Sequence, residues 1–374
     1  MSTTGRDQTP APSPSDLAAA VERAAFVRLV SDATGDALSG TGVLARALAA
    51  DDTPFQASVV APFADPDRTT EADVTVALGA GHGSADHMLA ARPAATAFAV
   101  ARELGASPDP VLALAGTVAG GDVDGTVADA AERAGVQRRP GLAVPVPDLA
   151  DGLAHSTLLS GPFSGDESAA RESLSGLDLP TGTTEDLTEG DHRRVASLVA
   201  LAATEDAPER AAETVAAGLY PYAGGPFETI GGYADVLDAV AREAPGTGIA
   251  LALGHEGVRE NALSAWRTHA KDAHGAVADA TTGRYDGLFV ARGDEMPAGT
   301  VARLLADFHA PEPVVLAVTD GEAAVRATDG RDVAAAMRAA TDAVGGRMVG
   351  QGDRARVQFD VPTSDLIEAF REAI

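Results

Sequence analysis

Residues 27–48 read VRLVSDATGDALSGTGVLARAL. The apolar run that ends at Val30 predicts a strand, Ser31–Gly42 predicts a polar turn with several glycines, and the remaining Ala-, Leu- and Arg-rich segment predicts a helix. A strand–turn–helix of this kind places a binding site at the carboxyl end of a strand in α/β proteins. Two aspartates in the turn, Asp32 and Asp36, are therefore candidate site residues.

The charge of the chain indicates the solvent in which it works. The 374 residues carry a formal net charge of -27, from 55 acidic and 28 basic residues, and 4% are aromatic. One of the basic residues is a lysine, Lys271, so 27 are arginines. Concentrated salt screens such self-repulsion within about 3 Å at 1 M. The composition is typical of extreme halophiles such as haloarchaea, and it makes overall basicity useless as a test for nucleic-acid binding.

Several classes of protein are excluded or disfavoured by simple counts. The sequence has no cysteine, which excludes disulfides and thiolate metal sites. It has no apolar run near the roughly 18 residues that a membrane span needs, so we expect no membrane association. Residues 1–16 are polar and proline-bearing, which predicts a disordered arm rather than a signal peptide. We expect a cytoplasmic protein.

The alternation of predicted strands and helices predicts two α/β domains. The first spans 17–180 and contains a largely parallel sheet that includes Val74–Leu78. A helical connector at 181–225 follows, and the second, smaller domain covers 226–374, with one of its strands expected at Ile249–Leu253. The fold class is therefore α/β with two domains.

Two separate segments, a glycine-rich turn and a later aspartate, contain candidate metal ligands. The segment GAGHGSADHM, residues 79–88, follows a predicted strand and contains His82, Asp86 and His87. Asp122 follows an apolar helix. Imidazole and carboxylate groups are ligands for divalent transition metals. The alternative is that these are solvated turn residues, which is common in glycine-rich loops.

A second candidate site lies near the C-terminus, where residues 345–360 read GGRMVGQGDRARVQFD. Arginines are concentrated here in a chain that is short of positive charge, and arginine is well suited to phosphate contacts. The alternative is that the arginines are the solvent face of a strand. The residues expected to contact phosphate or nucleic acid are Arg347, Gly350, Gln351, Arg354 and Arg356.

These pieces, in this order, resemble the RecJ-like branch of the DHH phosphoesterase superfamily, and its archaeal members most of all. Thr34–Thr41 is similar to the first motif, DADG-hydrophobic-[ST]-[AS]-G. GPFETIGGYADVLDAVAR at 225–242 resembles the segment that opens the second half, and residues 345–359 resemble the glycine-rich end of a DHHA1 domain. The resemblance implies a DHH-like parallel-sheet domain, a smaller DHHA1-like α/β domain, and a cleft between them.

The resemblance implies manganese-dependent hydrolysis of phosphodiesters, with a two-metal site that needs several converging carboxylates. This chain lacks ligands at three motif positions, where it has Thr34, Ala77 and Met88. The histidine expected near the C-terminus is Gln351, and Asp32 falls outside the first motif. The residues left to hold a metal are Asp36, His82, Asp86, His87 and Asp122. We predict a degenerate site without a tightly bound cofactor.

Three hypotheses follow. The first is a catalytically inactive RecJ-like protein of replication or repair that binds single-stranded nucleic acid or a protein complex, with GINS-type subunits as partners by analogy. The second is an active exonuclease or small phosphoesterase that uses Mn²⁺ or Mg²⁺ in a rearranged site, with His82 and Asp32 as substitute ligands. The third is a structural scaffold with no ligand in the cleft.

Overall fold

The computed structural model describes residues 13–64, 71–80, 85–180 and 182–374. Most of the predicted N-terminal arm lies outside these ranges. Helix α1 (Pro14–Val21) nevertheless begins inside the last residues of that arm, because the hydroxyl of Ser13 accepts a hydrogen bond of 3.2 Å from the backbone N–H of Asp16 and caps the helix. No helix in the described ranges is both long and apolar enough to cross a bilayer.

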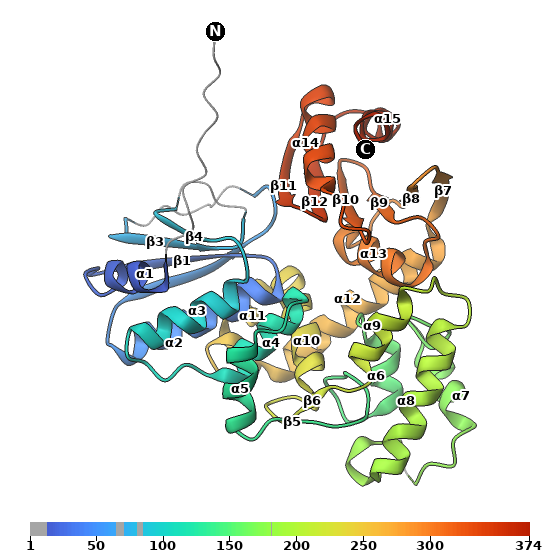
Figure 1. Ribbon diagram of the computed structural model, residues 1–374, viewed down its shortest axis with the longest axis horizontal. Coiled ribbons are helices and arrows are strands. Elements are labelled where there is room, and N and C mark those ends of the chain that lie inside the picture. The colour runs from blue at the N-terminus through green and yellow to red at the C-terminus, as the bar shows by residue number, and fades with distance from the viewer. Residues whose placement is uncertain (1–12, 65–70, 81–84, 181) are drawn as a thin grey trace.

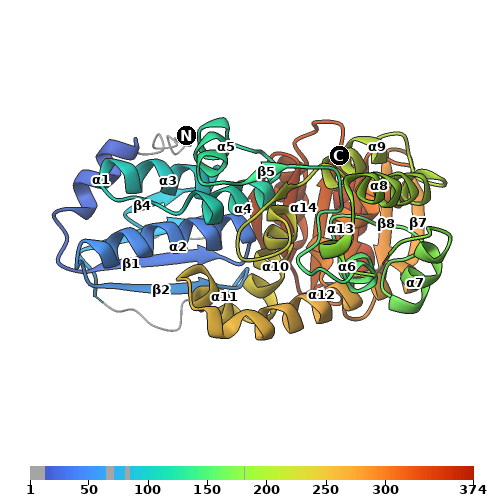
Figure 2. The ribbon, with the colours of Figure 1, turned by 90° about the horizontal axis from the view of Figure 1, so that it is seen from below.

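The N-terminal sheet has four parallel strands in the order β2-β1-β3-β4 (Figure 1). The parallel arrangement confirms the prediction from the sequence. Helices α2 and α3 pack against each other on one face of this sheet (Figures 1 and 2). The strands are β1 (Val27–Asp32), β2 (Phe55–Val60), β3 (Val74–Leu78) and β4 (His87–Leu89).

Helix α2 (Gly35–Ala50) begins inside the segment that the sequence predicted as a turn, so most of the expected turn is helical. The glycines in this stretch allow close packing of the helix. A Cβ atom at Gly40 would lie 2.9 Å from a methyl of Leu78, and one at Gly42 would lie 2.6 Å from the carbonyl oxygen of Ala252. The glycines indicated a turn, but their role is to bring other backbone and side chains against the helix.

The first core extends into the chain that was assigned to the second domain. Helices α10 (Ile230–Glu243) and α11 (Pro245–Ala252) share a core cluster with the parallel-sheet unit, and α10 packs against α2 and α4. The predicted strand at Ile249–Leu253 is wrong, because the segment lies largely within α11. A short apolar run does not by itself distinguish a strand from a buried helix. The other helices of this unit are α3 (Pro93–Glu103), α4 (Pro110–Gly120) and α5 (Gly125–Arg133).

Helices connect the two sheets. A second core cluster holds together α6, α8 and α9 with residues of α7 and of the C-terminal unit. The long helix α12 (Arg259–Asp279) contributes to both core clusters. Trp266 lies in the first cluster, and Ala273 lies in the second. The connecting elements are β5 (Gln137–Arg138), α6 (Leu149–His155), α7 (Glu167–Ser175), η1 (Thr184–Asp186), α8 (Glu189–Thr204), α9 (Ala211–Gly218), β6 (Tyr222–Ala223) and η2 (Glu256–Val258).

The C-terminal unit is a six-stranded sheet in the order β11-β12-β10-β9-β8-β7. Only the β8–β9 pair is parallel, so this sheet is mostly antiparallel. Helices α14 and α15 pack together in one of its core clusters, and α13 belongs to the other. The elements are β7 (Thr281–Tyr285), β8 (Leu288–Arg292), α13 (Ala298–Leu304), η3 (Leu305–His309, π-helical), β9 (Val314–Val318), β10 (Glu322–Ala327), α14 (Val333–Val344), β11 (Arg347–Gln351), β12 (Arg354–Gln358) and α15 (Thr363–Ala373).

Candidate nucleic-acid interface

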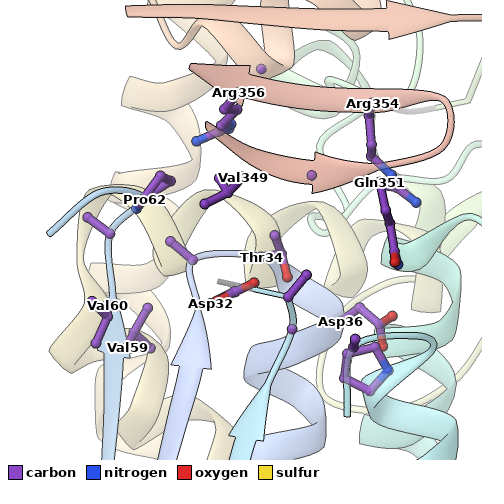
Figure 3. A pocket seen from close by; sticks show the side chains of 18 of the residues that line it. Asp32, Thr34, Asp36, Val59, Val60, Pro62, Val349, Gln351, Arg354 and Arg356 are labelled. Atoms are coloured by element: carbon purple, nitrogen blue, oxygen red, sulfur yellow. The ribbon is translucent and has the colours of Figure 1, made fainter. Parts of the chain in front are cut away.

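A cleft of about 1060 Å³ lies between the parallel-sheet unit and the C-terminal sheet. The end of β1 and the start of α2 form one wall, and the β11–β12 hairpin forms the opposite wall. Asp32, Thr34 and Asp36 face the hairpin residues Gln351 and Arg354 across this cleft (Figure 3). The sequence predicted both walls, and the structure brings them together.

The charge of the cleft is opposite to that of the chain. Among the described residues that line it, arginines outnumber aspartates by eight to four, whereas acidic residues outnumber basic ones by 55 to 28 in the sequence. Such a concentration of guanidinium groups favours an anionic ligand. The arginines are Arg28, Arg92, Arg242, Arg303, Arg326, Arg347, Arg354 and Arg356, and the aspartates are Asp32, Asp36, Asp122 and Asp238.

Asp36, the matching aspartate of the first motif, is used to join two helices. Its Oδ1 accepts a hydrogen bond of 2.8 Å from the backbone N–H of Ala94 at the start of α3. A Cβ atom at Gly120 would lie only 2.7 Å from its Oδ2. Burial raises the pKa of Asp36 to about 6, against the lowering effects of the Ala94 N–H and of Arg354 and Arg92. One carboxylate oxygen is therefore hydrogen-bonded, and the other lies beside Gly120.

Asp238 and Arg242, which the sequence analysis did not single out, form an ion pair on one face of α10. Oδ1 of Asp238 also accepts a hydrogen bond of 2.9 Å from the backbone N–H of Gly35, at the start of α2. Burial would raise the pKa of Asp238, but the adjacent Arg242 and the Gly35 N–H hold it at about 2. This carboxylate is therefore ionised, and it is bonded to both Arg242 and the Gly35 N–H.

Asp122, the predicted ligand after α4, forms an ion pair with Arg92. The Nε of Arg92 lies 3.0 Å from Oδ2 of Asp122, and another nitrogen of the guanidinium lies 2.8 Å from Oδ2 of Asp124. Arg92 has φ 50° and ψ 54°, a left-handed conformation that is uncommon for a residue with a side chain. The guanidinium thus bridges two of the carboxylates next to the cleft.

Asp86 and His87 lie toward the opposite end of the sheet from Asp36. An oxygen of Asp86 accepts a hydrogen bond of 2.8 Å from the backbone N–H of Thr75, near the start of β3. β4 runs parallel to β3, with His87 beside Val76. Thr75 is four steps of about 3.3 Å along the strand from Gly79, which lies at the end of the sheet where Asp36 is found. The expected grouping with Asp36 is therefore not formed, and His82 lies outside the described residues.

The structure gives local roles to the residues that replaced motif ligands. Thr34 caps α2, because its hydroxyl accepts a hydrogen bond of 3.3 Å from the N–H of Ala37. Ala77 is fully buried in β3, and Met88 is partly exposed in β4. Asp32 lies against Gly79, where the positive φ of 108° and the lack of a Cβ atom allow the close approach.

In the described part of the chain, three His, Asp or Glu side chains come close enough to share a cation at one place only. This group is Asp151, His155 and Glu167, on α6 and at the start of α7 rather than in the cleft. The carboxylate of Asp151 is already bonded to Arg267, at 2.7 Å, and to His155, at 2.9 Å. The residues of the cleft do not fit a two-metal centre, which requires several free carboxylates around ions about 4 Å apart.

All five residues predicted to contact phosphate line the cleft. Arg354 and Arg356 alternate with buried residues along β12, and their shared face is the wall of the cleft rather than open solvent. Gly350 has φ 136°, and a Cβ atom there would lie 2.5 Å from the backbone of β12, so the glycine serves the hairpin itself. Arg347 reaches the first unit, where it donates a hydrogen bond of 2.6 Å to the carbonyl oxygen of Phe63.

Arg356 is a half-buried cation with no hydrogen bond or ion pair to any described residue. Gly299 makes room for it, since a Cβ atom at that position would lie 2.2 Å from the guanidinium. Burial lowers the pKa of Arg356 to about 10, and the neighbouring charge of Arg242 contributes to the lowering. Two guanidinium groups from different units therefore lie near each other, an arrangement that an anion between them would stabilise.

Most of the arginines of the cleft could not be recognised from the sequence, because they are isolated in otherwise ordinary helices and strands. Arg303 is on α13 and Arg326 is on β10, far apart along the chain. The usable signal is in α10, where Asp238 and Arg242 are four residues apart in a helix that is mostly apolar and buried, apart from Asp235 and the terminal Glu243. Charges in such a helix indicate a buried polar contact.

Solved structures with a similar fold support the resemblance. RecJ from Thermus thermophilus in complex with Mg²⁺ has a TM-score of 0.51 at 16% identity over 98% of this chain, and the chain spans 52% of that RecJ chain. CDC45 from Entamoeba histolytica has a TM-score of 0.57 at 8% identity, with 93% of this chain and 95% of that chain covered. The fold is therefore RecJ-like, as the motifs predicted.

Two sequence comparisons identify relatives. A family model described as "Uncharacterized protein rrnAC1427, C-terminal domain" matches residues 280–372, which closely coincide with the C-terminal sheet unit. The protein described as "Uncharacterized protein rrnAC1427", from Haloarcula marismortui, is 68% identical over 375 residues and covers all of both chains. A haloarchaeal relative is consistent with the acidic composition. With this identity over its full length, the chain belongs to the family of the haloarchaeal protein rrnAC1427.

Proposed function

We propose that this protein is a RecJ-like, replication- or repair-associated protein that binds single-stranded nucleic acid in the interdomain cleft and does not hydrolyse it. The observation that carries the proposal is the convergence of eight arginines on one cleft in a chain of net charge -27. Nucleic-acid affinity rests mainly on phosphate contacts, which guanidinium groups supply.

The carboxylates support the absence of hydrolysis. Asp36 holds the start of α3, Asp122 pairs with Arg92, and Asp238 pairs with Arg242 and the Gly35 N–H. Each of these groups has a structural partner, and a two-metal site needs them as ligands. The likeness to CDC45 favours an association with the replication machinery, and GINS-type subunits are the protein partners that the resemblance suggests.

A single strand suits this cleft better than a duplex. Arginines line both walls, and apolar side chains such as Val30, Val59 and Val349 lie between them. Unpaired bases can contact apolar surface while the phosphates contact arginine, whereas a duplex hides its bases. Competition between single-stranded and duplex DNA of the same length tests this choice, and stronger binding of the duplex would contradict it.

The arginines are tested by the salt dependence of strand affinity. We compare the wild type with a triple variant, Arg347→Gln, Arg354→Gln and Arg356→Gln, by fluorescence anisotropy of a labelled oligothymidylate between about 1 and 3 M KCl, where salt screens the acidic chain. The slope of log K against log[KCl] should fall by up to about 2 in the triple variant, at about 0.7 per lost phosphate contact.

Arg338→Gln is the matched control, because Arg338 belongs to the same unit and does not line the cleft. It should leave the slope unchanged. Equal slopes for the wild type and the triple variant would remove these arginines from the binding surface and favour a scaffold with no ligand in the cleft.

A further inference from the structure

Arg92 is the cation that lies among the acidic residues around the start of α3. Its guanidinium makes ion pairs with Asp122 and Asp124 at 3.0 and 2.8 Å, and its charge also acts on Asp36. Two carboxylates between α4 and α5 thus pair with one arginine, and its charge also reaches a third carboxylate at the start of α2. A divalent cation held by carboxylate oxygens is another way to neutralise acidic groups that lie close together.

We propose that Arg92 is a built-in replacement for a metal ion, a fixed guanidinium that neutralises these carboxylates and keeps divalent cations out of the site. The proposal deepens the proposed loss of hydrolysis, and it does not depend on nucleic-acid binding. It follows from the disagreement between the fold, which RecJ shares in a complex with Mg²⁺, and the residues present in this chain.

The backbone supports a specific role for this residue. Arg92 occupies the position just before α3 in the left-handed region, where glycine would be the unstrained choice. From this position the side chain of Arg92 reaches the loop after α4. The first turn of α3 supplies the backbone N–H, that of Ala94, which binds Asp36. One short segment therefore engages two of the predicted metal ligands, one through the backbone and one through the guanidinium.

Binding of Mn²⁺ itself tests the proposal, by titration with detection of free Mn²⁺ by electron paramagnetic resonance. Arg92→Gly removes the guanidinium and fits the left-handed backbone, so the fold should be retained. We expect this variant to bind one Mn²⁺ about tenfold or more tightly than the wild type, because a neighbouring positive charge has been removed. Arg92→Lys keeps the charge and should behave like the wild type.

The surface of this acidic protein will bind Mn²⁺ weakly. The new site is therefore identified by comparing the Mn²⁺ binding of each variant with that of the wild type. Adding Asp36→Asn to Arg92→Gly should abolish the gain. The proposal is overturned if Arg92→Gly gains no site, or if the wild type already has a Mn²⁺ site that Asp36→Asn removes. Neither result would decide whether arginines of the cleft bind a strand, which the salt-dependence experiment measures separately.

Discussion

The Oδ1 atom of Asp36 lies 2.8 Å from the backbone nitrogen of Ala94 and accepts its hydrogen bond. This contact joins the first turn of α2 to the start of α3, directly beside the cleft. The aspartate that most resembles a catalytic metal ligand is therefore part of the packing of the fold. Its chemistry is that of a buried carboxyl group, and its titration gives the first prediction.

Asp36 should make stability depend on pH. Its pKa is raised from 3.8 to about 6 in the folded protein, so the folded state binds more protons between these values. The contribution of this carboxyl group to the free energy of unfolding is fully present below about pH 4, where the group is protonated in both states. It is lost as the pH rises through about 6, where the group ionises in the folded protein. Asp36→Asn keeps an acceptor for the Ala94 N–H but cannot ionise.

We therefore expect the stability of Asp36→Asn relative to the wild type to rise by about 2 kcal/mol between pH 4 and pH 7. Thermal unfolding of both proteins across this range, at constant high KCl, measures the difference. The exposed aspartate Asp129, changed to asparagine, is the control and should show no such trend. A difference that stays constant or falls with pH would show that the pKa is not raised.

Removing one partner of the ion pair between Asp238 and Arg242 should strongly destabilise the protein. Asp238→Ala would leave the guanidinium of Arg242 and the N–H of Gly35 without their acceptor. We expect a loss of about 3 kcal/mol in the free energy of unfolding. Asp129→Ala on the exposed face of α5 should change it by less than about 0.5 kcal/mol. Similar effects for the two variants would contradict the role assigned to Asp238.

The close contact between α2 and α11 gives a prediction with a paired control. A Cβ atom at Gly42 would lie 2.6 Å from the carbonyl oxygen of Ala252, so Gly42→Ala should destabilise the protein by about 1–3 kcal/mol. Gly246, in α11, has open space around its Cα atom, and Gly246→Ala should be neutral or stabilising by up to about 1 kcal/mol. Thermal melts of the two variants measure these changes. Equal effects of the two substitutions would show that the interface between α2 and α11 is loosely packed.

Local sequence patterns predicted the local structure well. Val74–Leu78 is a strand with the predicted ends, and the alternation of strands and helices predicted the parallel sheet. The run Ile249–Leu253 was assigned wrongly, because a short apolar run fits a strand and a buried helix equally well. Gly42 was placed in a turn for a similar reason: a glycine that permits close packing looks the same as one that permits a turn.

The arrangement of the site depends on contacts that are distant along the chain. Asp86 and His87 are close to the end of β3 in sequence, but the parallel pairing of β4 places them beside the start of that strand. The role of the Asp238–Arg242 pair becomes clear only from the fold, which places the backbone N–H of Gly35 against Asp238. The arginines of the β11–β12 hairpin were predictable as a group, but the arginines that other elements bring to the same cleft were not.

The most direct test of the central claim is the fate of a labelled single strand that is bound in the cleft. A 5′-labelled strand is incubated with the protein and Mn²⁺ in about 2 M KCl, where salt screens the acidic chain, and its length is read on a denaturing gel. We predict that the strand is bound and remains at full length. Shortened products that disappear in the Asp36→Ala, Asp122→Ala double variant would contradict the account and show that the cleft is a working active site.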